Sequence, residues 1–162
     1  SFQDSFSSTD RLWVPVLIAN MADNNNNSYE QLTLDNIIEY LKTLPQDIKN
    51  LLGNVGDVEI QEISDGNINL VYLVKNTVTK QNLVIKQALP YLRKYKDWAL
   101  TLSRANFEVQ VLKLEKKAAP EHVPDVYYFD EEKRAIIMEF VSPHIILRKE
   151  MVKKIVYPHL GE

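Results

Sequence analysis

The 162-residue chain is long enough to bury one hydrophobic core, and 45% hydrophobic with 25% charged residues is a balance typical of soluble globular domains. Nineteen basic and 22 acidic residues give a net charge of −3, so we expect no broad positive surface for nucleic acid or anionic lipid. The absence of cysteine excludes a disulfide framework, a thiolate metal site and a cysteine nucleophile, and it favours a cytoplasmic location.

Residues 1–28 are expected to lie outside the folded domain, as a disordered or extraneous segment. The apolar run Trp13–Ala19 is far shorter than the roughly 20 residues that span a bilayer, and no basic segment precedes it. We therefore predict neither a membrane helix nor a secretory signal. Met21 opens an asparagine-rich polar stretch, so we expect the natural start there.

Two short helices are predicted next. Thr33 can cap the first helix, which ends at Pro45, and a second helical turn closes at Gly53. The apolar positions that recur at helical spacing in the first helix are Leu34, Ile37, Ile38, Leu41 and Leu44. Those of the second turn are Ile48, Leu51 and Leu52.

Five strands and one long helix follow, in the order three strands, helix, two strands. The predicted strands cover residues 58–63, 68–74, 83–88, 126–129 and 135–140, and the helix covers residues 103–117. The first two strands form a hairpin with Gly66 at its tip. Because strands joined by short turns pair antiparallel, this order predicts an α+β fold with a five-stranded antiparallel sheet.

Lys86 and Glu108 are the two charged residues that this layout singles out. Side chains alternate along a strand, so Lys86 projects on the same face as Val84 and Ala88, where an isolated lysine is most often a snorkelling edge residue. Glu108 lies on the long helix between two apolar stripes, which predicts a helix packed on two sides. The stripes are Ala105, Val109 and Leu112 on one side and Phe107, Val111, Leu114 and Ala118 on the other. A carboxylate at such a boundary needs a cation, and the alternatives are pairing with Lys113 or exposure to solvent.

Phosphoryl transfer gives these residues a common purpose. A strand lysine held by a helix glutamate can neutralise nucleotide phosphates, while the hairpin tip supplies backbone N–H donors. The usual Gly-x-Gly-x-x-Gly loop is absent, since Gly66 is the turn's single glycine, and Asp-Gly is also a good ordinary hairpin turn. The end of the last strand, around residues 139–141, could hold an adenine edge or be a plain strand end.

The histidines predict no metal site. They are His122, His144 and His159, and their spacing does not match that of metal ligands. No serine, histidine and acid arrangement is legible, so nothing in the sequence favours nucleophilic hydrolysis.

Six segments, spread in order between residue 62 and residue 149, carry a resemblance to a known family. They are Glu62–Tyr72, Val84–Tyr91, Asp97–Thr101, Arg104–Glu108, Val123–Asp130 and Pro143–Lys149. These segments resemble the 5-methylthioribose kinases. The resemblance implies the N-terminal lobe of a protein-kinase-like fold at residues 29–141, then a hinge and the start of a second lobe at residues 142–162.

In a complete enzyme, the resemblance implies transfer of the ATP γ-phosphate to the 1-hydroxyl of 5-methylthioribose in methionine salvage, with Mg²⁺ and with homodimer formation as one option. The nucleotide-contacting residues would be Asp65, Gly66, Asn67, Asn69, Lys86, Glu139, Phe140 and Val141. Lys86 and Glu108 would form the catalytic, phosphate-orienting ion pair, and Trp98 would lie near the mouth of the active site. The catalytic aspartate, the Mg²⁺ ligands and the sugar-binding arginines would belong to the lobe that follows Glu162, so we expect this chain alone to be inactive and to expose an apolar docking face.

Two other interpretations stay open. The chain could be a non-catalytic nucleotide-binding or interaction module of the same fold, which a genuine stop codon after Glu162 would favour. An aminoglycoside- or choline-type kinase lobe fits the layout without the specific segments. The sequence also departs from the family at Phe140, Ser142 and residues 153–154, which affects only the finer substrate assignment.

Overall fold

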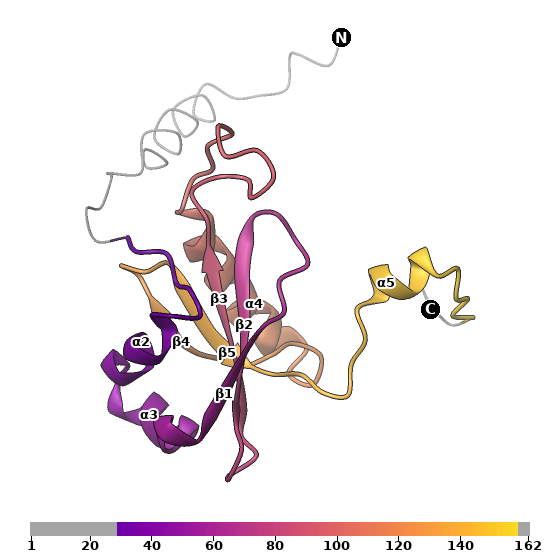
Figure 1. Cartoon of the computed structure of the whole chain (residues 1–162). Helices are drawn as coiled ribbons and strands as arrows, with labels where there is room; N and C mark the ends of the chain where they lie inside the picture. Colours follow the sequence, from indigo (N-terminus) through magenta and orange to yellow (C-terminus); the bar gives the residue numbers. More distant parts are fainter. Residues whose placement is uncertain (1–28, 159–162) are drawn as a thin grey trace, which may run out of the picture.

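The computed structural model describes residues 29–158 and contains one five-stranded sheet with helices on both faces (Figure 1). The strands are β1 (Val58–Glu62), β2 (Asn69–Asn76), β3 (Asn82–Ala88), β4 (Val126–Asp130) and β5 (Ala135–Glu139). The helices are α2 (Ile37–Thr43), α3 (Gln46–Leu52), α4 (Arg104–Ala118) and α5 (Leu147–Val152), with a 3-10 turn η1 at Val55–Asp57. Our predictions for residues 1–28 and 159–162, including Met21 and His159, lie outside the described residues.

The strand order is β1-β2-β3-β5-β4, and every neighbouring pair is antiparallel. The second hairpin therefore enters the sheet through β5, which places Ile136 opposite Lys86 in the register. This arrangement confirms the predicted α+β fold, its antiparallel sheet and the long helix after the third strand. The predicted limits of these strands and of α4 differ from the observed ones by two residues or fewer.

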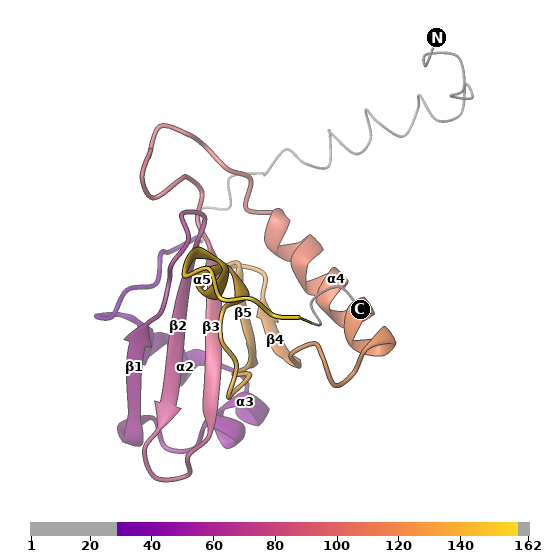
Figure 2. The ribbon, with the colours of Figure 1, turned by 90° about the vertical axis from the view of Figure 1, so that its right-hand side faces the viewer.

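Alternation along β3 divides the core between the two faces of the sheet. Leu83 and Ile85 point into the larger cluster, which contains the apolar residues of α2 and α3. Val84 packs against the smaller cluster, where Val109 of α4 meets Ile136 and Met138 of β5. Figure 2 shows α5 in front of the sheet, with α2 and α3 behind it.

The prediction that α4 is packed on two sides is wrong. Ala105 and Val109 of the first stripe are buried, but the second stripe faces outward, and Leu114 is 68% exposed. Phe107 and Val111 of this stripe are also exposed. The helix lies against β3, β4 and β5 on one side, and the side chains of its second stripe face solvent. A pattern of apolar residues cannot show whether anything covers them.

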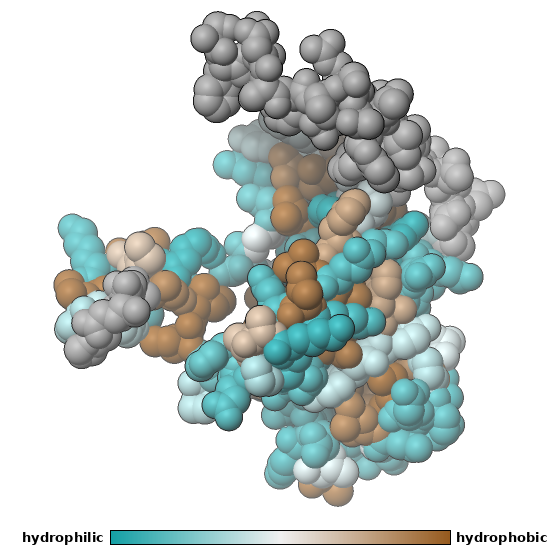
Figure 3. Space-filling view, turned by 180° about the vertical axis from the view of Figure 1, so that it is seen from behind, coloured by the Kyte–Doolittle hydropathy of each residue, from teal (hydrophilic) through white to brown (hydrophobic). Residues whose placement is uncertain are grey.

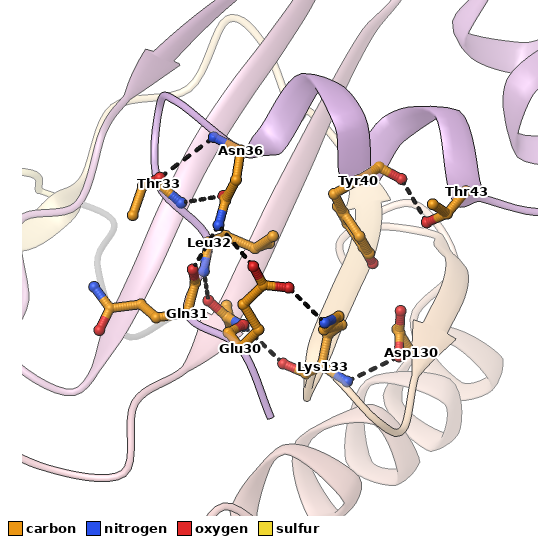
Figure 4. Close-up of polar contacts among 10 residues, drawn as sticks. Glu30, Gln31, Leu32, Thr33, Asn36, Tyr40, Thr43, Asp130 and Lys133 are labelled. Atoms are coloured by element: carbon orange, nitrogen blue, oxygen red, sulfur yellow. Dashed lines mark hydrogen bonds and ion pairs between the residues drawn. The ribbon is translucent and has the colours of Figure 1, made fainter. Parts of the chain in front are cut away.

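The first helix begins later than predicted, at Ile37. Thr33 and Asn36 bond reciprocally: Thr33 N–H donates to Asn36 Oδ1 (2.7 Å), and Asn36 N–H donates to Thr33 Oγ1 (3.3 Å) (Figure 4). This closed pair resembles a capping box and holds the residues between its members in a turn. Leu34, which shares the helical spacing of the apolar positions, lies in this turn outside the helix and is exposed. Gly53 ends α3 as predicted, with a φ of 80°.

After β5 the chain leaves the sheet and forms α5, a helix that we did not predict (Figure 1). In residues 29–158, no helix has both the length and the apolar character needed to cross a bilayer.

Candidate functional site

Lys86 and Glu108 form an ion pair between β3 and α4, with Lys86 Nζ donating to Glu108 Oε1. The pair forms because Lys86 lies on the face of β3 that α4 covers. It answers the question that the sequence left open, since the partner of Glu108 is Lys86 and not Lys113. The two side chains remain 27% and 32% exposed, so a ligand on this face of the sheet can reach them.

The loop between β1 and β2 is held by its carbonyl groups. Asn67 O accepts from Arg93 N (2.8 Å), and Ile68 O accepts from Leu89 N (3.0 Å). The amide N–H groups of residues 65–67 donate to no other described residue. A Cβ placed on Gly66 would meet nothing within 4 Å, so the backbone there is open. The loop can therefore offer N–H donors to an anion.

Asn69 is the first residue of β2 and is oriented by α4. Its Oδ1 accepts from Arg104 Nη2 (3.2 Å), and the same nitrogen donates to the carbonyl of Ile68. Sequence reasoning singled out Asn69 but assigned no role to Arg104. One feature of the sequence could have drawn attention to Arg104: it begins the family-like segment that ends with Glu108.

The carboxylate of Asp65 points toward α5 and not toward the free N–H groups of its own loop. Asp65 Oδ2 accepts from Arg148 Nη2 (2.6 Å), and Lys149 Nζ lies 3.9 Å from the same oxygen. A carboxylate would repel phosphate, so only the backbone of Asp65 suits the predicted contact. We did not anticipate Arg148 in this region, because 83 residues separate it from Asp65.

At the end of β5, Glu139 is engaged with the residue before β4. Glu139 N–H donates to Asp125 O (2.8 Å), and Asp125 N–H donates to Glu139 Oε2 (3.1 Å). Glu139 therefore cannot offer its N–H to an adenine edge while this contact is intact. Val141 is exposed, and its N–H donates to no other described residue, so it suits that role better.

A pocket of about 390 Å³ lies beside this strand end. It is lined by Lys116, Pro120, Glu121, His122, Val123, Glu139, Val141 and His144. The sequence did not indicate that His122 and His144 lie near one pocket, because they are 22 positions apart and their spacing matches no local motif. Within residues 29–158, no three histidine, aspartate or glutamate side chains are grouped for a metal ion.

Trp98 is exposed in the loop before α4. It lines an open pocket of about 540 Å³ with Tyr95, Asp97 and Ala99. This loop contacts the β1–β2 hairpin. Arg93 forms an ion pair with Glu62 (2.8 Å), and its backbone N–H donates to Asn67 O. Its place beside the hairpin is compatible with the predicted position near a site mouth.

Comparison with known proteins finds relatives that are methylthioribose kinases. Methylthioribose kinase 2 of Oryza sativa subsp. japonica is 38% identical over 148 residues, which cover 90% of this chain and 34% of the relative. The methylthioribose kinase of Escherichia coli O45:K1 is 38% identical over 144 residues, covering 88% of this chain and 34% of that protein. The Geobacillus thermodenitrificans methylthioribose kinase is 43% identical over 107 residues, covering 63% of this chain and 27% of that protein.

No family model matches the chain. Among solved structures, a Plasmodium vivax ethanolamine kinase aligns with a TM-score of 0.39 and 18% identity, covering 87% of this chain and 33% of that one. The chain spans about a third of the length of the first two curated relatives.

Proposed function

Since the chain is related by sequence to a segment of the methylthioribose kinases, we propose that it forms the ATP-binding lobe of such an enzyme. The complete enzyme would transfer the γ-phosphoryl group of ATP to the 1-hydroxyl of 5-methylthioribose. The observation that carries this proposal is the Lys86–Glu108 ion pair, which joins the sheet to α4 on a face that solvent can reach.

The geometry suits a polyphosphate. A lysine held by a carboxylate supplies a positioned positive charge, and the free N–H groups of residues 65–67 supply hydrogen-bond donors. Asn69 adds a side-chain amide at the start of β2. These groups bind and orient phosphates, which is most of what a protein contributes to phosphoryl transfer.

We assign the remaining roles as follows. Glu108 orients Lys86, and the backbone near Val141, with Phe140 beside it, faces the adenine edge, whereas Glu139 maintains the end of the strand. Mg²⁺ would be held by acidic residues outside this chain. Residues 29–141 would form the lobe and the following segment its hinge, in a cytoplasmic enzyme that could act as a dimer.

Calorimetric titration of the purified chain with ATP and Mg²⁺, followed by an assay for 5-methylthioribose phosphorylation, tests the proposal. We expect weak binding without turnover. Lys86→Met should lower ATP affinity at least tenfold, since a charge-assisted contact is lost. Glu108→Gln should have a smaller effect in the same direction, because the lysine keeps its charge but loses its positioning partner.

Lys75→Met is the matched control, because Lys75 is a half-buried lysine on β2 that makes no ion pair with another described residue. It should bind ATP like the unchanged chain. Equal affinity in a folded Lys86→Met protein would contradict the phosphate assignment. Turnover by this chain alone would show that the catalytic groups lie within it.

A further inference from the structure

The terminal nitrogens of Arg104, the first residue of α4, donate hydrogen bonds to Thr101, Ile68 and Asn69. Its Nη1 donates to Thr101 O (2.6 Å), just before the helix. Its Nη2 donates to the carbonyl of Ile68 and to Asn69 Oδ1, which lie 35 or more residues earlier in the chain. The guanidinium therefore joins the start of α4 to the junction of the β1–β2 loop with β2.

The bonds depend on the shape of this side chain. A guanidinium presents donors in a rigid planar fork, so it can hold two separate acceptors at fixed angles. A lysine ammonium is a point charge on a flexible stem and cannot reproduce that arrangement. The hydrogen bonds from the terminal nitrogens of Arg104 to the loop region go to oxygen atoms, and the amide N–H groups of residues 65–67 stay open.

The same helix carries Glu108, one turn after Arg104. Residues four apart on a helix lie on the same side, about 6 Å apart along the axis. One rigid element thus holds the loop through Arg104 and the Lys86 ammonium through Glu108. A shift of α4 would move both attachments together.

The other end of α4 is attached to the end of β5. Lys116 Nζ donates to Val123 O (2.9 Å) and lies 3.2 Å from Asp125 Oδ1. Asp125 in turn exchanges two hydrogen bonds with Glu139. Arg104 and Lys116 are twelve positions apart, which corresponds to roughly 18 Å along the helix axis.

We infer that α4 positions the nucleotide site as one unit, and that Arg104 is the positioning residue that couples the phosphate-binding loop to the Lys86–Glu108 pair. This inference rests on the proposed function. It assigns Arg104 no contact with the nucleotide. Its contribution is to keep Asn69 and the loop at a constant separation from Lys86.

Arg104→Met, with Arg134→Met as the matched control, tests this coupling. Arg134 also joins α4 to the sheet, through a 2.8 Å hydrogen bond from Nη1 to Asn106 Oδ1, but it does not touch the loop. Titration with ATP and with adenosine separates the phosphate contacts from the base contacts. We expect Arg104→Met to lower ATP affinity about tenfold and adenosine affinity by less than twofold. Arg134→Met should change neither.

Arg104→Lys should restore little of the ATP affinity, because it keeps the charge without the fork. Equal ATP affinity in folded Arg104→Met, or a full recovery in Arg104→Lys, would overturn the inference. So would parallel losses of ATP and adenosine affinity together with a lower melting temperature, since these indicate a general structural role.

Amide hydrogen exchange gives a readout that needs no ligand. The amides of Leu89 and Arg93 donate to the loop carbonyls, so they should exchange faster in Arg104→Met and at the original rate in Arg134→Met. Unchanged exchange in Arg104→Met would overturn the coupling even if ATP binding were lost. If the unchanged chain binds no ATP while exchange responds as expected, the nucleotide assignment fails and the coupling within the fold stands.

Discussion

Tyr40 carries a buried hydroxyl on the face of the sheet opposite to the candidate site. The residue is 6% exposed, and its hydroxyl has no hydrogen-bond partner in the described part of the chain. Figure 4 shows the ring pointing toward Asp130, whereas the Tyr40 carbonyl accepts from the hydroxyl of Thr43 (2.8 Å). Burial first, and then the negative charge of Asp130, raise the pKa of Tyr40 far above its ordinary value.

This raised pKa makes the stability of the fold sensitive to alkaline pH. Below about pH 10 the Tyr40 hydroxyl is protonated in both the folded and the unfolded chain. Above about pH 10 it ionises in the unfolded chain first, which stabilises the unfolded state relative to the folded one. Stability should therefore fall as the pH rises above 10, and Tyr40→Phe should reduce that fall. At pH 7 the variant should lie within about 1 kcal/mol of the original, because it removes an unpaired group. Urea denaturation at pH 7 and at a pH above 10 measures the free energy of unfolding of both proteins.

Tyr95→Phe is the control, since Tyr95 is exposed in the loop before α4 and should leave the alkaline loss unchanged. A loss of ~2 kcal/mol or more in Tyr40→Phe at pH 7 would mean that the hydroxyl makes a stabilising bond.

Among the elements, the side chain of Asn76 connects the end of α3 with the turn between β2 and β3, and it lies against Gly53. Gly53 has a φ of 80°, and a Cβ there would lie 3.0 Å from Asn76 Nδ2. The buried Asn76 side chain donates to Leu52 O (2.9 Å) and accepts from the amides of Val78 and Thr79 (2.8 Å each). The helix end and the turn therefore share one set of bonds.

Gly53→Ala should destabilise the fold by about 1–3 kcal/mol, because it combines an unfavourable φ with displacement of Asn76. Gly66→Ala should cost much less, since its Cβ meets nothing. If phosphates approach the loop backbone, however, Gly66→Ala should weaken ATP binding. Denaturant unfolding and ATP titration of both variants separate these effects, and equal destabilisation by both would contradict the argument.

At the scale of the whole molecule, apolar side chains are exposed on the segment that leaves the sheet. Figure 3 shows this segment as a projecting arm with several hydrophobic residues on its surface. The exposed apolar residues are Ile145, Ile146, Leu147, Met151, Val152, Ile155, Val156 and Tyr157. Their number exceeds the scattered single exposures that are normal for soluble proteins, and such surfaces mark an interaction face or an aggregation risk.

We expect the isolated chain to self-associate through this segment as its concentration rises. Replacing Ile146, Val152 and Val156 together by serine should raise the monomer fraction measured by sedimentation velocity. The matched control replaces the outward residues of α4, Phe107, Val111 and Leu114, by serine. Equal recovery in the control would assign association to α4, and a monomeric unchanged chain at all concentrations would contradict the expectation.

The order of the helices and strands could be predicted from the amino-acid sequence. Alternating and helical apolar periods are local patterns, so the limits of β3 and α4 could be predicted within two residues. The same alternation assigned Lys86 to the face of Val84. Family-like segments brought Asn69, Lys86 and Glu108 into one hypothesis, although the roles of these residues remain predictions.

Which of these side chains contact one another depends on how the elements pack in three dimensions. The Lys86–Glu108 pair, the Arg104–Asn69 bond and the Asp65–Arg148 pair join residues 22, 35 and 83 positions apart. Local periodicity carries no information about such distances, because the packing of α4 and the path of the chain after β5 determine them. The one-sided burial of α4 has the same origin. A stripe of apolar residues indicates which side of a helix can be buried, and the packing of neighbouring elements determines whether that side is buried.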